Sequence, residues 1–353
     1  MAKLKINIRN MQIALGLLWL LDGILQLQPR MFTSAFANNV IAPAAQGEPG
    51  FVYALMHFAL HLVLLQPAWF NALFALIQLS LGTLIIHKKT TKFGLIASAV
   101  WAFIVWSFGE GFGGIFSGHT LLLIGAPGAA VLYLLLALSL LPKKDRLNAS
   151  PRYWLVFVWL GIWLGGGIYQ LLPGQDNARN IGSIISSNAA GASGWLASLD
   201  SHVGKWIIGL GHYSFDSHPV MVQMAGMSMS APVSSGSSHP GYLLILGLAL
   251  VQLLIGLGVL FPGIWRRIMI IAGSILALAF WVLGQNMGGF YSGTMTDPNS
   301  GPLFVLLGLT LLGISGLDAQ LSQFGKRVSA LLLGDNHNLK QFVVEPVESE
   351  IIQ

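Results

Sequence analysis

The sequence predicts an all-α, polytopic membrane protein with eight transmembrane helices, arranged as two parallel four-helix repeats. Three observations support this fold class. The chain is 54% hydrophobic and only 9% charged, whereas soluble proteins carry about 25% charged residues. Long apolar runs recur along its length. A glycine-rich segment, WSFGEGFGGIFSG at Trp106–Gly118, returns in register as WVLGQNMGGFYSG at Trp281–Gly293, which indicates a constrained backbone turn that is used twice.

The composition also excludes several classes of site. In so apolar a chain, the net charge of +5 indicates membrane topology and a lipid bilayer as partner, with no nucleic acid. The absence of cysteine excludes disulfides, thiolate metal sites and cysteine nucleophiles. The basic start, MAKLKINIRNMQ, is not followed by a small-residue cleavage site. We therefore expect it to flank the first span rather than form a removed signal peptide.

Residues 1–147 are predicted to form the first four-helix membrane repeat. A further segment, Phe51–Gln66, is too short for a hydrocarbon core of about 30 Å, since about 16 residues of helix span roughly 24 Å. We expect it to be an extra short interfacial helix on the outer face. The four predicted spans are Met11–Leu27, Phe70–Ile86, Gly94–Phe108 and Leu121–Leu141.

Residues 148–320 are predicted to form the second four-helix membrane repeat. Its short interfacial helix, Trp195–His212, contains Asp200, His202 and Lys205, which are costly in hydrocarbon. A Met/His-rich outer loop at 213–240 has no counterpart in the first repeat, and residues 321–353 form a cytoplasmic tail. The predicted spans are Trp154–Leu171, Tyr242–Phe261, Ile268–Gly284 and Gly301–Leu317.

Matching residues relate the two repeats along their length. Trp19 matches Trp163 and Gln26 matches Gln170, while Gln78 matches Gln252 farther along the chain. After the glycine-rich segment, Pro127 matches Pro302 when no gap is introduced. These matches predict that both repeats share one scaffold, although their ionisable groups differ.

The basic residues predict the orientation. With the N-terminus in the cytoplasm and the short helices not spanning, 15 of the 18 Lys and Arg residues lie inside, and Arg30, Arg179 and Lys205 lie outside. Counting the short helices as spans would place the Lys88–Lys92 cluster outside. We therefore expect a multi-pass protein of the cell membrane, with both termini cytoplasmic and both repeats pointing the same way.

Candidate ligand-binding residues gather on the predicted outer side. His57 and His61, four residues apart, share one helix face. Asp22 and Glu110 are carboxylates within or at the end of apolar spans, where a charge needs compensation. His119 follows the first glycine-rich turn, and Gln285 occupies the position of Glu110 in the second repeat. The alternatives are histidines that contact lipid headgroups and carboxylates that make structural hydrogen bonds.

The outer loop suggests a metal site. Thioether and imidazole ligands suit copper, and the alternative is a flexible loop whose methionines bind nothing. The glycines do not indicate a nucleotide site, because a phosphate-binding glycine motif follows a strand and here the glycines close a membrane span. The candidate metal ligands are Met221, Met224, Met227, Met229, His212, His218 and His239.

The opening GLLWLLDGILQLQP, Gly16–Pro29, is followed by an outer loop and three further spans. This unit, present once in each half, resembles the DoxX/DoxD-like membrane protein family as a tandem duplication. The resemblance implies a quinone-linked role and transfers no catalytic residue. We expect a membrane subunit of a quinone-linked redox system that binds a small molecule, for example a quinone, at the exoplasmic face beside other membrane redox subunits. The alternatives are a non-enzymatic copper-handling protein and a structural subunit of a larger membrane complex; whether the protein is an enzyme stays open.

Overall fold

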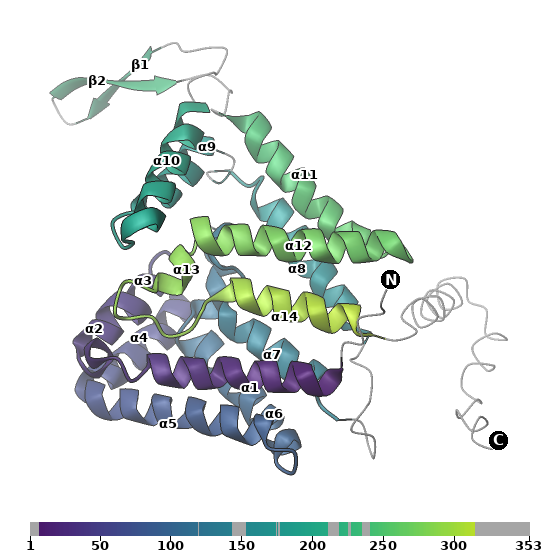
Figure 1. Ribbon diagram of the computed structural model, residues 1–353. Coiled ribbons are helices and arrows are strands. Elements are labelled where there is room, and N and C mark those ends of the chain that lie inside the picture. Colours follow the sequence, from purple (N-terminus) through teal and green to yellow (C-terminus); the bar gives the residue numbers. More distant parts are fainter. Residues whose placement is uncertain are drawn as a thin grey trace.

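The computed structural model describes residues 7–118, 120–142, 153–173, 175, 177–210, 219–224, 227–234 and 241–314. This part of the chain is almost entirely helical (Figure 1). By length and composition, four of its helices could cross a membrane, so the fold is compatible with an integral membrane protein. They are α1 (Ile8–Leu25), α5 (Pro67–Ile86), α6 (Thr91–Phe108) and α12 (Ile264–Leu283).

Shorter apolar helices complete the bundle. They are α4 (Gly50–Leu65), α7 (Ala129–Ser139), α8 (Leu155–Tyr169), α11 (Tyr242–Gly258) and α14 (Ser300–Leu312). The sequence predicted a helix that begins at Leu121, but helix α7 begins at Ala129. Pro127 lacks an N–H group and Gly128 has a φ of 104°, so the backbone cannot be helical through them. The preceding residues form only a short 3₁₀ turn, η4 (Leu122–Ile124).

The loops that follow α1 and α8 contain further short elements. After α1 come η1 (Pro29–Phe32), α2 (Ser34–Phe36), η2 (Ala37–Ile41) and α3 (Ala42–Ala44). After α8 come α9 (Ala178–Asn188), α10 (Gly194–Leu210) and the antiparallel strands β1 (Pro219–Met224) and β2 (Met227–Ser234). The pattern of apolar residues did not predict α9, because these residues are few in it. Those few lie on one buried face that includes Ile181 and Ile185.

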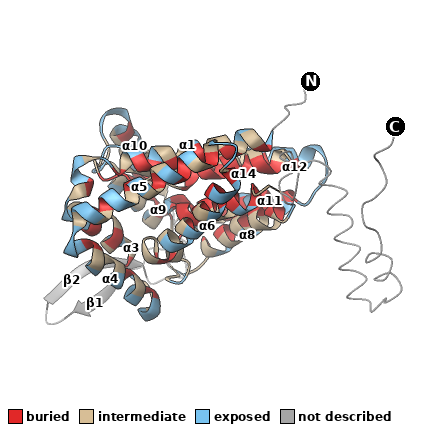
Figure 2. Ribbon diagram, turned by 90° about the horizontal axis from the view of Figure 1, so that it is seen from below, coloured by how far each residue is buried: buried red, intermediate tan, exposed pale blue. Residues whose placement is uncertain are grey.

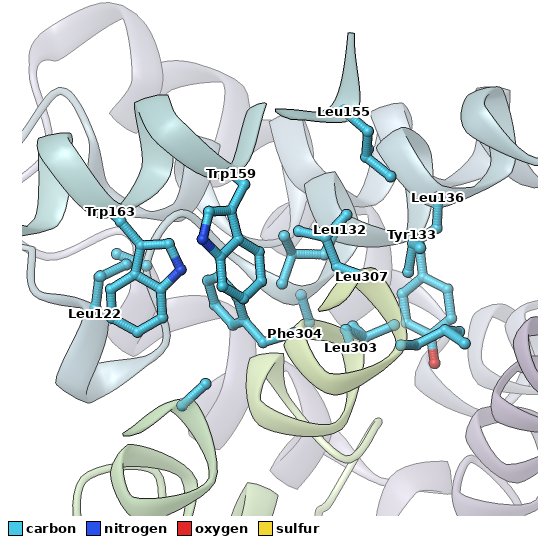
Figure 3. Packing of buried hydrophobic residues seen from close by; sticks show 14 of the residues in the cluster. Leu122, Leu132, Tyr133, Leu136, Leu155, Trp159, Trp163, Leu303, Phe304 and Leu307 are labelled. Carbon is cyan, nitrogen blue, oxygen red and sulfur yellow. The ribbon is translucent and has the colours of Figure 1, made fainter. Parts of the chain in front are cut away.

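Both halves of the chain contribute to one hydrophobic core. Helices α7 and α14 are buried along almost their whole length. Figure 3 shows Trp159 and Trp163 of α8 packing beside Phe304 of α14, with Leu122 and Leu132 of the first half nearby. The core is therefore continuous across the predicted boundary between residues 147 and 148.

The outward faces of the helices are also apolar. Figure 2 shows the buried residues on the inner faces of the bundle and the exposed ones outside. Several exposed side chains are large and hydrophobic, among them Leu76 (63% exposed), Leu243 (82%) and Ile275 (62%). A surface of this kind is costly in water and is expected where helices meet lipid.

Two helix pairs cross closely at glycine. A Cβ atom at Gly23 of α1 would overlap Leu79 of α5, and a Cβ atom at Gly167 of α8 would overlap Leu253 of α11. Small residues at such crossings let helix backbones approach each other. The α1–α5 and α8–α11 pairs thus pack through matching positions of the two halves.

The two glycine-rich segments adopt the same unusual backbone conformation. Positive φ angles occur at four consecutive residues of each segment, in η3 (Gly111–Gly114) and in α13 (Asn286–Gly289), with values between 48° and 77°. This left-handed region favours glycine and strains other residues, here Phe112, Asn286 and Met287. The prediction of a constrained turn at both places is confirmed.

A tryptophan anchors each turn to the start of the next helix. Trp106 Nε1 donates a hydrogen bond to the Pro127 carbonyl oxygen (2.8 Å), and Trp281 Nε1 donates to that of Pro298 (2.6 Å). The counterpart of Pro127 is therefore Pro298, and the ungapped match with Pro302 was wrong. The connection between turn and helix is shorter in the second half, so sequence identity alone placed the proline incorrectly.

Two arginines close the opposite end of the bundle. Arg9 donates to the carbonyl groups of Ile85 and Ile86 at the end of α5, and Arg266 donates to those of Val259 and Leu260 after α11. These contacts satisfy carbonyl groups that helix ends leave unpaired. In Figure 1 the α5–α6 and α11–α12 connections lie at the right end of the bundle, and α13 with α2, α3 and α4 lies at the left.

Replacing Gly113 with alanine should lower the melting temperature of the detergent-solubilised protein more than Gly118→Ala does. Both glycines have positive φ, so each substitution incurs strain of about 1–3 kcal/mol. Only at Gly113 would the new Cβ also overlap the Pro127 carbonyl, whereas nothing lies within 4 Å of the Cβ at Gly118. Equal melting temperatures for the two variants would contradict this account of the turn.

Candidate functional site

Two cavities meet at the carboxylates of Glu110 and Asp297. The first, here called the apolar cavity, has a volume of about 370 Å³ and lies between α4, α5 and α6. The second, the polar cavity, has a volume of about 410 Å³ and lies beside the first glycine-rich turn. Both are lined by Val40, Gly109, Glu110, Thr296 and Asp297. The shared wall therefore combines residues from the two halves of the chain.

Aromatic side chains dominate the apolar cavity. Exposed Phe58 of α4, Leu73 of α5 and Ile104 of α6 line it, so it reaches the outer apolar surface of the bundle. Its aromatic lining is Phe36, Phe58, Phe70, Phe74, Trp101 and Phe108. Apolar cavities with a few polar groups at one end are typical of small-molecule sites.

Glu110 sits where α6 has ended and caps the N-terminus of α7. Both of its carboxylate oxygens accept a hydrogen bond from the Ala130 N–H (3.1 and 3.2 Å). The N-cap residue of α7, Gly128, has no side chain to do this, and a Cβ there would overlap the Glu110 carboxylate. The left-handed turn and the glycine together bring a carboxylate to the helix end, where the helix dipole favours it.

The pKa of Glu110 is raised from 4.5 to about 8, first by burial and then by the nearby Asp297 carboxylate, although hydrogen bonds from the N–H groups of Ala130 and Ala129 act in the opposite direction. The Glu110 side chain is only half-buried, because it lines both cavities. A carboxyl group with this pKa can hold or release a proton near neutral pH.

Asp297 reaches the site from the second half. Its carboxylate accepts hydrogen bonds from Thr296 Oγ1 and from the Asn299 N–H, both at 2.7 Å. Burial raises the pKa of Asp297, and these two hydrogen bonds oppose the shift. Asp297 was not among the predicted site residues, although an Asp-Pro-Asn sequence just before an apolar helix is typical of a turn stabilised by the aspartate side chain.

Asp22 belongs to the same group of residues. It is buried in α1 (1% exposed), beside Tyr133 of α7 and within electrostatic reach of Asp297. Tyr133, also buried, lies within electrostatic reach of Asp22, Glu110 and Asp297. Asp22 and Glu110 are thus connected through Tyr133 and Asp297, two residues that the sequence did not indicate, but Asp22 itself lines neither cavity.

Two glutamines complete the apolar cavity. Gln26 and Gln78 are buried (3% and 7% exposed) and line it, and the side-chain oxygen of each has no hydrogen-bond partner. From the sequence, Gln26 and Gln78 were noted only as positions that match between the two predicted repeats. Polar residues within apolar spans were the signal that could have identified them.

Gln285 takes over part of the structural role of Glu110 in the second half. Its Oε1 accepts from Ser300 Oγ at the start of α14 (3.1 Å), and its Nε2 donates to the Leu122 carbonyl (3.4 Å). It is buried and lines neither cavity. The structure does not place this residue where a ligand in either cavity would touch it.

The two histidines of α4 face away from the carboxylates. His57 and His61 are exposed, and His57 stacks on Tyr53. The cavity side of α4 consists of Phe58, Ala59, Leu62 and Val63. The structure does not bring these imidazoles to Glu110, and His119 lies outside the described residues.

The predicted copper ligands are placed only in part. Met221 and Met224 belong to β1, Met227 and Met229 belong to β2, and Met224 is the cross-strand partner of Met227. His212, His218 and His239 lie outside the described residues. Within the described ranges, no three His, Cys, Asp or Glu side chains are grouped so that they could hold a metal ion. Copper binding by this loop stays a prediction.

Comparisons with family models, with curated proteins and with solved structures find no match for this chain. The resemblance to the DoxX/DoxD-like family therefore stays a prediction.

Glu110→Gln should reduce the pH dependence of thermal stability. Because the pKa of Glu110 is raised to about 8, its stabilising contribution is fully present below about pH 4.5 and is lost as the pH rises through 8. The melting temperature of the unmodified protein in detergent should fall between pH 5 and pH 9. In the Glu110→Gln variant it should fall less. Parallel curves for the two proteins would show that Glu110 titrates normally.

Proposed function

We propose that this chain is a polytopic membrane protein that binds a quinone-like molecule in the apolar cavity, as a membrane subunit of a redox system. The observation that carries the proposal is the meeting of an aromatic cavity with Glu110 and Asp297. A quinone has a flat ring, which suits aromatic walls, and oxygen atoms whose chemistry requires proton exchange. Carboxyl groups next to the ring are the type of residue that can provide such exchange.

Access from the bilayer supports a lipophilic ligand. The apolar cavity reaches the exposed surface between α4 and the α5–α6 pair through Phe58, Leu73 and Ile104. The polar cavity lies on the other side of Glu110 and is lined by Gln46, Glu48 and Ser117. A ligand could thus arrive from lipid while its polar end stays close to a hydrophilic compartment.

We propose further that eight helices cross the membrane as two parallel four-helix repeats, with the two cavities on the outer side. Among the described helices, four are long and apolar enough to cross a membrane by themselves. Helices α7 and α14 are short, but the non-helical segment before α7 is largely buried in protein and the one before α14 is partly buried, and irregular backbone is tolerated at membrane depth where protein covers it. The matching turns, tryptophan anchors and glycine crossings support the duplication.

The ligand proposal can be tested by filling the apolar cavity. Ala59 lines it, whereas Ala54 is exposed on the same helix. In titration calorimetry of purified protein with decyl-benzoquinone, Ala59→Trp should weaken binding at least about 10-fold, since an overfilled site excludes the ring, and Ala54→Trp should not. Absence of binding by the unmodified protein would refute the proposal.

The orientation can be tested by single cysteines, because the chain contains none. Exposed positions at the two ends of the bundle are Lys89 and Arg267 at one, and Asn39 and Ser187 at the other. In intact cells, an impermeant maleimide should label Asn39→Cys and Ser187→Cys but not Lys89→Cys or Arg267→Cys, because basic connections stay in the cytoplasm. Labelling of Lys89→Cys from outside would reverse the topology.

A further inference from the structure

The polar cavity connects Glu110 with the surface of the protein. Glu110 lines it where it meets the apolar cavity, and exposed Gln46 lines it as well. Its volume of about 410 Å³ has room for several water molecules, since each occupies roughly 30 Å³ in the liquid. Among the described residues, no Lys, Arg or His lines this cavity, so no positive side chain there repels a proton. Water in such a cavity can carry protons between titratable groups.

Glu48 is a carboxylate that lines the polar cavity and not the apolar one. Its neighbours in the sequence, Gln46 and Gly47, are exposed. Glu48 also lies close to the segment that carries Glu110, because a Cβ atom at Gly111 would be 3.5 Å from Glu48 Cγ. Its Oε2 is covered and has no hydrogen-bond partner, and burial raises the pKa of Glu48. A carboxyl group in this position can pass a proton between surface water and water beside Glu110.

The other directions from Glu110 offer protons no such path among the described residues. Its carboxylate accepts from the Ala130 N–H at the start of α7, and Leu132, Tyr133 and Leu136 of that helix are packed in the core, none more than 2% exposed (Figure 3). Close packing of this kind leaves no room for water. The apolar cavity opens at the apolar outer surface, where lipid would hold no water either.

We propose that Glu110 exchanges its proton with the outer solution through the polar cavity, and that Glu48 relays this proton between the cavity and the surface. In the exchange, the O–H bond of the Glu110 carboxyl group breaks, the proton passes to cavity water, and an O–H bond forms at the Glu48 carboxylate; no electron moves. The inference rests on the proposed function for its ligand and orientation. It adds the side of the membrane on which protons of that ligand enter and leave.

The test is time-resolved infrared spectroscopy of the purified full-length protein after a laser-induced drop in pH, with no ligand added. The carboxyl C=O band that is absent from Glu110→Gln reports the protonation of Glu110. Glu48→Gln should slow the appearance of this band at least about 10-fold, because a positioned acid–base group speeds proton transfer by such factors, and Glu48→Asp should restore most of the rate. Gln46→Leu, at the same cavity, and Ala59→Trp, which fills the apolar cavity, should leave the rate unchanged.

An unchanged rate in Glu48→Gln would overturn the inference, and so would equal slowing in Glu48→Gln and Glu48→Asp, which indicates a structural role alone. Sidedness gives a second measurement that keeps Glu48 intact. In vesicles whose orientation is fixed by maleimide labelling of Asn39→Cys, a pH drop on the Asn39 side should protonate Glu110 rapidly, and a drop on the opposite side should not. Equal rates from both sides would refute the route. No ligand is present, so failure of decyl-benzoquinone to bind would refute the proposed function and leave these rates to decide the proton route.

Discussion

The buried N–H groups at the start of α7, which have no partner within the helix, are the constraint on which this end of the molecule depends. Helix N-termini leave donors unpaired, and inside a protein they need partners. Gly128 cannot cap the helix, so Glu110 does so from the preceding segment. The chain reaches that position only because four consecutive residues adopt left-handed angles and Trp106 fixes the turn to Pro127. Turn, cap and cavity wall are thus parts of one arrangement.

The second half meets the same requirement with neutral groups. Asn299 caps α14 through its own side chain, which accepts from the Ser300 N–H, and Gln285 binds the Ser300 hydroxyl group. The Asp297 carboxylate accepts a hydrogen bond from the N–H group of the cap residue Asn299 and also lines both cavities together with Glu110. Two similar backbones therefore carry different electrostatic roles.

Sequence patterns predicted much of the helical framework and part of the site. Apolar runs located most helices well, and repeated glycines predicted the paired turn. The pattern failed at Leu121–Leu141, where hydropathy continues through Pro127 and Gly128 although the helix does not. It missed α9 because a helix on the protein surface needs only one apolar face.

The site was only half predictable, because proximity between distant segments leaves little trace in one sequence. Asp22 and Glu110 stood out as carboxylates in apolar surroundings. Asp297 and Tyr133 did not, since one lies in an ordinary turn and the other in an ordinary apolar helix. The i, i+4 spacing of His57 and His61 correctly placed both on one helix face, but it could not indicate whether that face points into the bundle.

The shared wall between the cavities bears on how such a protein could arise. Glu110 and Asp297 come from opposite sides of the proposed duplication, so one four-helix unit alone would hold only part of the wall. An ancestor with a single four-helix unit would have completed this wall by pairing with an identical copy. Such a pair would contain two equivalent sites related by a two-fold axis. Once two copies are joined in one gene, their sequences can diverge, so that one site can keep its carboxylates while the other loses them.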